Sequence, residues 1–338
     1  MSITRVIREA PNHGAFLGLV FLTPKSVLPS QQSYFLGVHC VENNKQRTTP
    51  MSTFESFYIS CQDGYPLAAQ FYPTTQPHKK PLPILICPAT GITKKFYHHF
   101  AVWLSEQGYD VLVFDFRGIG ESLYSHVRHS QASIVQWGQL DLPAAIDSVL
   151  LRTQAKQVIL VGHSAGGQLL GITPNHHKVA KVVAVAGSSG NMKGLKGRTR
   201  LLAPVMFKVL FPVARYTLGY GPTQAIGMGE NLPKDVARQW AQFCSRSGYV
   251  QNAIGDTVAT HQDFHAQVSC PITSIWASDD EIATASTVSD FLRLFPHANT
   301  TSVELHPKRY QHASIGHMAM FKKSHQNLWP VLEQYCAA

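Results

Sequence analysis

The sequence lacks any uninterrupted apolar run of about 18 or more residues, so it predicts no stable membrane insertion. It also lacks the basic runs with interleaved aromatic residues that are typical of nucleic-acid binding. The 29 Lys and Arg outnumber the 20 Asp and Glu and give a net charge of +9, but they are scattered along the chain. We therefore expect neither nucleic acid nor the membrane interior as a partner.

Cysteine pairs at CxxC or metal-type spacing are absent as well, although the chain contains six cysteines. Cys87 and Cys270 fall in apolar, strand-like runs, where a free buried thiol is the usual state. Free thiols favour a reducing compartment, so the predicted location is the cytoplasm.

The first 50 residues differ in composition from the rest of the chain. Residues 15–22 (AFLGLVFL) form a short apolar run that faintly resembles a signal peptide, but no small-residue cleavage site follows. Residues 23–50 are rich in Gln, Ser, Thr, Pro and Asn, as poorly packed segments are. Residues 1–50 are therefore predicted to be a disordered extension, or to lie upstream of the true start.

From residue 54 onward, strand-like and helix-like segments alternate. Several of the strand-like runs are apolar throughout, which is typical of a parallel sheet covered on both faces. The pattern therefore predicts an α/β fold with a mostly parallel, doubly wound sheet. The predicted strands are residues 54–61, 66–73, 82–89, 109–116, 157–162, 178–187, 271–278 and 300–306. The predicted helices are residues 94–108, 133–152, 284–295 and 322–336, with another that begins at Ser164.

One interval is too long for a simple crossover between strands. Residues 190–268 contain the apolar segment 200–218 and a helical pattern at 234–248. We predict that 190–268 is an inserted helical cap over the sheet, and that residues 51–189 and 269–338 form the core domain. Prolines and basic residues interrupt segment 200–218, so a lid helix is favoured over a membrane segment, with interfacial lipid contact as a minor alternative.

A serine lies between glycines where an apolar strand ends. The stretch Gly162-His-Ser-Ala-Gly166 fits the pattern GxSxG at a predicted strand-to-helix turn. Such a turn is tight and strained, and it projects the Ser164 hydroxyl above the sheet. We therefore predict Ser164 to be a catalytic nucleophile that needs a base and an orienting acid.

Position in the fold selects the base and the acid. His317 lies in the loop after the last predicted strand, at the same sheet edge as Ser164, whereas His163 is expected to pack elsewhere. The strand 271–278 ends at Asp279-Asp280; Asp280 is the preferred acid, and Asp279 is the alternative. Ser164, Asp280 and His317 then follow one another along the chain in the order nucleophile, acid and base.

Other histidines do not form a recognisable metal site. The pairs His98-His99 and His176-His177 lack the HExxH arrangement of zinc enzymes. We predict no metal and no cofactor.

At these motifs the chain resembles the α/β-hydrolase superfamily. It is most similar to the branch of bacterial α/β hydrolases near the serine aminopeptidase-like and lysophospholipase-like enzymes. The matching stretches span most of residues 51–338 and lie at 88–122, 161–168, 232–244, 277–283 and 315–321. The resemblance implies the roles given above for the triad, and an oxyanion hole formed by the backbone N–H groups of Ala165 and Thr90. Pro88-Ala89 replaces the commoner His-Gly, so Gly91 stays an alternative to Thr90.

These features predict a cofactor-independent serine hydrolase that forms an acyl-enzyme. The resemblance favours esters, thioesters or lysolipid-like molecules over peptides, so the expected partner is a small acyl substrate. An acyltransferase could use the same triad, and a non-catalytic binding protein could retain the fold. The sequence does not define an oligomeric state. The motif at 115–122 (DFRGIGES) is interpreted as structural, with substrate contact by Arg117 as a secondary option.

Overall fold

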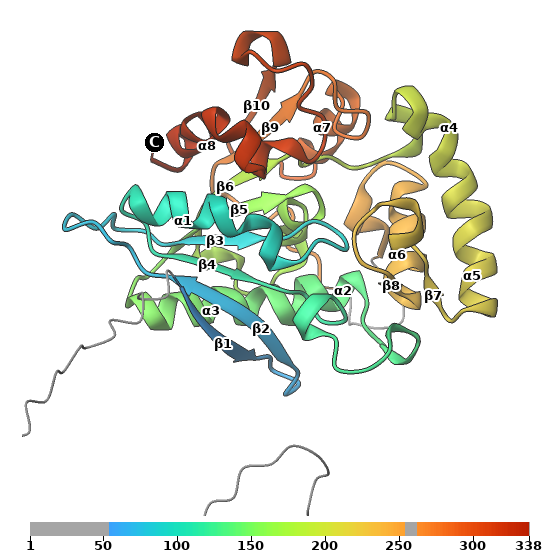
Figure 1. The fold of residues 1–338 in the computed structure, drawn as a ribbon, viewed down its shortest axis with the longest axis horizontal. Coiled ribbons are helices and arrows are strands. Elements are labelled where there is room, and N and C mark those ends of the chain that lie inside the picture. The colour runs from blue at the N-terminus through green and yellow to red at the C-terminus, as the bar shows by residue number, and fades with distance from the viewer. Residues whose placement is uncertain (1–53, 254–261, 338) are drawn as a thin grey trace, which may run out of the picture. The chain divides into compact units, whose positions relative to one another are not determined.

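The computed structural model describes residues 54–253 and 262–337, and these contain a central eight-stranded sheet (Figure 1). The strand order is β1-β2-β4-β3-β5-β6-β9-β10; β1 and β2 pair antiparallel, β2 and β4 pair antiparallel, and the remaining pairs are parallel. All eight predicted strands are confirmed. Their bounds are β1 Glu55–Ser60, β2 Pro66–Tyr72, β3 Ile84–Cys87, β4 Val111–Phe114, β5 Val158–His163, β6 Val179–Val185, β9 Ile272–Ala277 and β10 Thr300–Leu305. The predicted extension at residues 1–50 lies outside the described residues.

The apolar strands are buried on both faces of the sheet. In β3, Ile84 and Ile86 belong to one hydrophobic cluster, whereas Leu85 and Cys87 belong to the other. Side chains alternate between the faces of a strand, so a strand covered on both sides must be apolar at every position. This explains the continuous apolar runs in the sequence.

Helices cover the two faces. Helices α1 and α8 pack on one face and α3 packs on the other (Figure 1). The α-helices are α1 His98–Glu106, α2 Ile134–Gln136, α3 Leu142–Thr153, α4 Gly197–Val205, α5 Phe211–Thr217, α6 Lys234–Cys244, α7 Ala285–Leu292 and α8 Trp329–Ala337. A π-helical turn at Trp137–Asp141 joins α2 to α3, and another at Met206–Leu210 joins α4 to α5.

The sheet has a switch point between β3 and β5. The chain leaves β3 toward α1 and leaves β5 toward the face that carries α3, although the two strands are neighbours in parallel register. Loops that diverge in this way leave a crevice at the carboxyl ends of the strands, where α/β proteins bind ligands. Thr90 follows β3 and Ser164 follows β5, so both lie at this crevice.

We call residues 190–268, between β6 and β9, the inserted segment; its described residues, 190–253 and 262–268, are mostly helical. It contains α4, α5 and α6 and a short two-stranded sheet of β7 (Tyr220–Gly221) and β8 (Leu232–Pro233). The aromatic rings of Phe207, Phe211 and Trp240 pack together and join the α4–α5 region to α6.

The motif at 115–122 supports the fold. The Arg117 side chain is buried; its Nε donates to Asp141 Oδ1 at 2.6 Å and its Nη1 to Asp63 Oδ2 at 2.7 Å. Lys94 Nζ is buried against Asp115 Oδ2 at 2.8 Å. These paired charges link the loops at the edge of the sheet, in line with the structural interpretation of the motif.

Candidate active site

Ser164 occupies a strained turn at the end of β5. Its φ is +49°, a backbone conformation that residues other than glycine rarely adopt. A Cβ atom at Gly162 would lie 2.4 Å from the backbone of Gly167, and one at Gly166 would lie 2.2 Å from the carbonyl oxygen of Cys87. Only glycine fits at either position, which confirms the expected tight turn.

The helix predicted to begin at Ser164 is wrong in type. Two short 3₁₀ helices, Ser164–Gly167 and Leu169–Ile172, replace a continuous α-helix. Gly166, Gly167 and Gly171 disfavour helix propagation, and Pro174 stops it. No α-helix therefore begins at Ser164, and the dipole of a long helix does not act on its hydroxyl.

His317 and Asp280 are joined by a hydrogen bond. His317 Nδ1 lies 2.8 Å from Asp280 Oδ2, and the Asp280 side chain is fully buried. Asp280 Oδ1 accepts hydrogen bonds from the backbone N–H groups of Ile282 at 2.7 Å and Ala283 at 3.0 Å. A carboxylate only accepts hydrogen bonds, so the proton of the neutral imidazole sits on Nδ1 and Nε2 keeps its lone pair.

Asp279 holds the loop that carries His317, a role that the sequence did not reveal. Its carboxylate accepts from Ser314 Oγ at 2.7 Å and from the N–H groups of Ile315 at 2.9 Å and Gly316 at 3.0 Å. Partial burial raises the pKa of Asp279, but these hydrogen bonds outweigh it and the net pKa is below the usual value. The two adjacent aspartates thus contact the same loop at different points.

A buried chain of hydrogen bonds also contacts the backbone of His317. Ala89 N–H donates to Tyr97 Oη at 2.9 Å, and Tyr97 Oη lies 2.8 Å from His163 Nδ1. His163 Nε2 lies 3.0 Å from the carbonyl oxygen of His317 and must donate to it, so Nδ1 accepts from the tyrosine. Burial, and then the nearby His317 ring, lowers the pKa of His163 to about 3, so this imidazole is neutral.

His163 was expected to pack away from the reaction, and it is fully buried. Sequence reasoning missed its bond to the backbone of His317. The two residues are separated by 154 positions, and no local pattern encodes such a contact. The remaining signal is an aromatic residue, Tyr97, near the start of the helical segment that follows β3.

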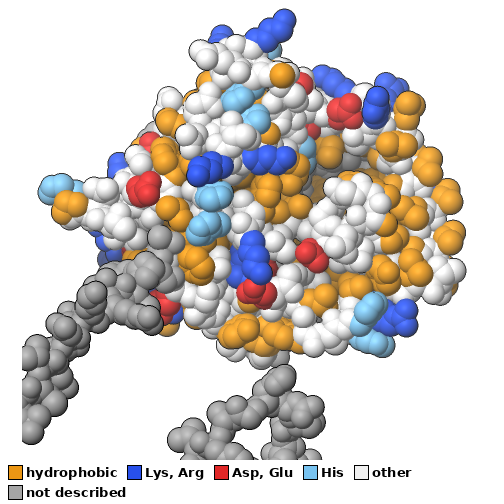
Figure 2. Space-filling model, viewed as in Figure 1, with side chains coloured by type: hydrophobic (Ala, Val, Ile, Leu, Met, Phe, Trp, Pro, Cys, Tyr) orange, Lys and Arg blue, Asp and Glu red, His pale blue; other side chains and the backbone are white. Residues whose placement is uncertain are grey.

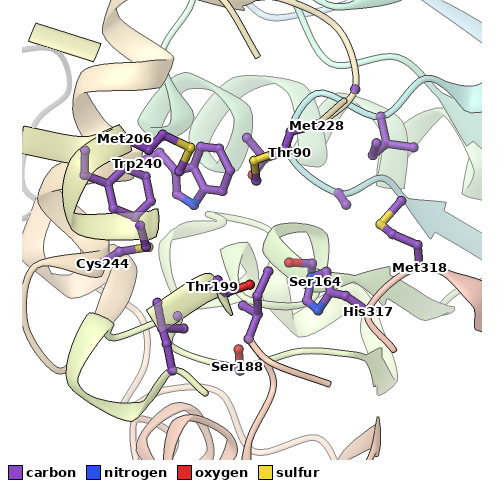
Figure 3. Close-up of a pocket in the computed structure, with 18 of the residues that line it drawn as sticks. Thr90, Ser164, Ser188, Thr199, Met206, Met228, Trp240, Cys244, His317 and Met318 are labelled. Atoms are coloured by element: carbon purple, nitrogen blue, oxygen red, sulfur yellow. The ribbon is translucent and has the colours of Figure 1, made fainter. Parts of the chain in front are cut away.

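Ser164 and His317 line the same cavity, and their side chains lie next to each other in Figure 3. Thr90 lies on the wall of this cavity, whereas Gly91 is not one of its lining residues. The buried Ala165 directly follows Ser164. The close approach of Gly166 to the end of β3 brings the turn after Ser164 against the loop that carries Thr90.

The cavity has a volume of about 210 Å³ and a mostly apolar wall. Among the described residues that line it, none is Asp, Glu, Lys or Arg. Two of its lining residues, Gln168 and Tyr249, have a buried polar atom (Oε1 and Oη) without a hydrogen-bond partner in the described part of the chain. The inserted segment contributes Leu195, Thr199, Ala203, Met206, Phe207, Met228, Trp240, Cys244 and Tyr249. An uncharged, apolar group fits such a cavity.

Metal ligands do not cluster in the part of the chain that the structure describes: no group of three His, Cys, Asp or Glu is placed to hold an ion. In the same residues, no helix combines the length and apolar character needed to cross a membrane.

A mostly parallel sheet of this strand order, with a serine on a sharp turn after β5, defines the α/β-hydrolase fold. The model of the Alpha/beta hydrolase family matches residues 84–325, and the chain belongs to this family. No match to the sequence is found among curated proteins.

Solved structures share the fold at low sequence identity. A soluble variant of monoglyceride lipase from Saccharomyces cerevisiae, in complex with a substrate analogue, has a TM-score of 0.59 at 15% identity; the match covers 85% of this chain and 96% of that chain. An esterase of Pyrococcus furiosus has a TM-score of 0.54 at 12% identity, and the match covers 83% of this chain and 89% of that chain.

Proposed function

We propose that the protein is a cofactor-independent serine hydrolase that cleaves acyl esters, thioesters or lysolipid-like substrates through an acyl-enzyme. The observation that carries the proposal is the hydrogen bond between His317 and the buried Asp280, beside a serine held at positive φ in one apolar cavity. A strained serine next to an oriented imidazole is the arrangement that nucleophilic catalysis requires.

In this mechanism Ser164 Oγ attacks the carbonyl carbon of the substrate while His317 Nε2 accepts the hydroxyl proton. Asp280 stabilises the resulting imidazolium, and the backbone N–H groups of Ala165 and Thr90 stabilise the oxyanion. The tetrahedral intermediate collapses, and His317 returns the proton to the leaving alcohol or thiol. Water then attacks the acyl-enzyme with His317 as base, which releases the acid and restores Ser164.

The cavity supports an acyl substrate over a charged one. The described residues of its wall include no Lys or Arg to pair with a phosphate or carboxylate, and their apolar side chains favour an alkyl or aromatic acyl group. The inserted segment supplies much of that wall, so we infer that residues 190–268 act as the cap that selects the acyl group.

Labelling with a fluorophosphonate probe tests the proposal. We expect the intact chain to gain the mass of one probe and to hydrolyse p-nitrophenyl esters, and we expect Ser164→Ala to lose both properties. Ser188→Ala is the matched control, because Ser188 lines the same cavity but lies outside the proposed triad. Folded wild-type protein that neither labels nor hydrolyses any ester or thioester of a chain-length series would refute the proposal.

A further inference from the structure

The helical segment 197–218 carries an apolar stripe on its outer side. Seven of the eleven large hydrophobic side chains that are exposed in the described residues fall between 201 and 218. Figure 2 shows apolar side chains along this edge of the molecule, where Figure 1 places α4 and α5. We define the outer stripe as Leu201, Leu202, Val205, Val209, Val213 and Tyr216. Their spacing of mostly three or four residues places them on one side of the helix.

The opposite side of the same helix already has its apolar partners. Ala203, Met206 and Phe207 are buried and line the cavity that contains Ser164. The stripe is therefore additional to the packed face, and its exposure is not explained by the core. Exposed apolar side chains that gather in this way mark an interaction surface.

The segment that carries the stripe is basic, and the acidic side chains beside it come from other segments: Arg215 Nη2 lies 3.8 Å from Asp235 Oδ1, and Glu281 accepts a hydrogen bond from the backbone N–H of Arg198. Residues 191–229 contain six Lys or Arg and no Asp or Glu, a net charge of +6 out of the +9 of the whole chain. All six side chains are exposed; they are Lys193, Lys196, Arg198, Arg200, Lys208 and Arg215. An apolar helix face flanked by cations is the pattern of a helix that lies in the interface of an anionic bilayer.

We propose that the outer stripe docks onto an anionic lipid surface, with the stripe among the acyl chains and the cations on the lipid phosphates. Two observations favour lipid over protein. The stripe has six side chains, whereas a standard protein interface needs about 20–30 residues on each side. A symmetric dimer through this face would also bring two +6 segments together, which is unfavourable.

In this orientation the helical segment 197–218 would contact lipid with one side and line the proposed acyl cavity with the other. The surface is separate from the triad, so this proposal goes beyond the proposed function and does not depend on it. A Ser164→Ala protein should bind lipid as the wild type does.

Sedimentation of the full chain with vesicles tests the proposal. The vesicles are phosphatidylcholine alone, or phosphatidylcholine with about 30% phosphatidylglycerol, an anionic fraction high enough to give a strong surface potential. We expect wild-type protein to sediment with the anionic vesicles and to be released by high salt. The stripe variant Leu202→Ser/Val209→Ser/Val213→Ser should lose at least about tenfold in partitioning because three apolar side chains no longer enter the interface.

Two further variants complete the test. The charge variant Arg198→Gln/Arg200→Gln/Lys208→Gln should bind about 100-fold less, at roughly fivefold per cation near an anionic surface. Leu151→Ser is the matched control, because Leu151 is 75% exposed but lies on α3, outside the stripe; it should bind like the wild type. Circular dichroism confirms that each variant is folded.

Three results would overturn the proposal. The first is wild-type protein that stays in the supernatant with both kinds of vesicle. The second is a stripe variant that sediments as Leu151→Ser does, which would place lipid binding elsewhere on the chain. The third is a lipid-free wild-type dimer in analytical ultracentrifugation that the stripe variant abolishes, because the stripe would then belong to a second copy.

Discussion

The adjacent aspartates Asp279 and Asp280 allow a test in which the same chemical change is made at neighbouring positions. Asp280→Asn and Asp279→Asn each replace one carboxylate by an amide of the same size and remove one negative charge. Their hydrogen bonds differ, so the expected results differ as well.

The contacts of Asp280 fix the orientation of the amide in Asp280→Asn. Oδ1 accepts from the N–H groups of Ile282 and Ala283, so the amide oxygen must take that position and the NH₂ group must face His317 Nδ1. His317 then accepts at Nδ1 and carries its proton on Nε2, where it cannot act as base toward Ser164. The corresponding change in a serine-protease triad lowers kcat by about 10⁴-fold, or about 5 kcal/mol, and we expect a similar loss.

In Asp279→Asn the amide oxygen can keep the bonds from Ser314 Oγ and Ile315 N–H, while the NH₂ group faces the N–H of Gly316. One hydrogen bond is lost and two donors meet, which should lower the free energy of unfolding by about 1–3 kcal/mol. His317 keeps its tautomer, so kcat should fall by no more than about tenfold, because only positioning is affected.

The assay is steady-state hydrolysis of a p-nitrophenyl ester, with urea unfolding of the same samples. Asp280→Asn that keeps more than about a tenth of the wild-type kcat would refute the reasoning about the tautomer. A loss of kcat in Asp279→Asn that equals the loss in Asp280→Asn would refute the separation of the two roles.

Three other changes test the surroundings of the site. Tyr97→Phe leaves Ala89 N–H and His163 Nδ1 without their partner, so urea unfolding should show a loss of about 2–4 kcal/mol; an unchanged stability would contradict the buried link. The pKa of His163 is lowered from 6.5 to about 3, so its contribution to stability is complete above pH 6.5 and is lost as the pH falls toward 3. Between pH 6 and 4 the wild type should lose about 1.4 kcal/mol per pH unit more than His163→Gln, and equal slopes in urea titrations would argue against a neutral buried imidazole. Gly166→Ala places a Cβ atom 2.2 Å from a backbone oxygen of β3 and should abolish soluble or active protein, whereas Gly316→Ala meets no atom within 4 Å and should cost only about 1 kcal/mol for its positive φ.

Much of the fold could be predicted from the sequence because continuous apolar runs mark the central strands of the sheet. A strand that is buried on both faces leaves a continuous signal, and β3, β4 and β5 are such strands. The short strands β7 and β8 were missed, because two residues each are too few to form a pattern. The 3₁₀ helices after Ser164 were missed because the expectation came from the motif and did not weigh the glycines that follow it.

The residues of the candidate triad could be predicted from the order of strands and loops along the chain. Loops at the carboxyl ends of parallel strands meet at one edge, so Ser164, Asp280 and His317 could be expected together, and the structure brings them to one cavity or to hydrogen-bond distance. The choice between Asp279 and Asp280 depended on side-chain direction, which two consecutive carboxylates do not reveal. The Tyr97–His163 link depends on contacts between distant segments and could not be read locally.

The loop that carries His317 is tied to the chain by groups distant in sequence, at separations of 37 residues for Asp280 and 154 for His163. Contacts between residues so far apart in sequence require the intervening segments to fold first. We therefore expect them to form late and slowly during refolding. Recovery of turnover after dilution from denaturant would then report completion of the native state and should trail the return of helical signal. The rate at which enzymatic activity returns would therefore measure the last stage of folding.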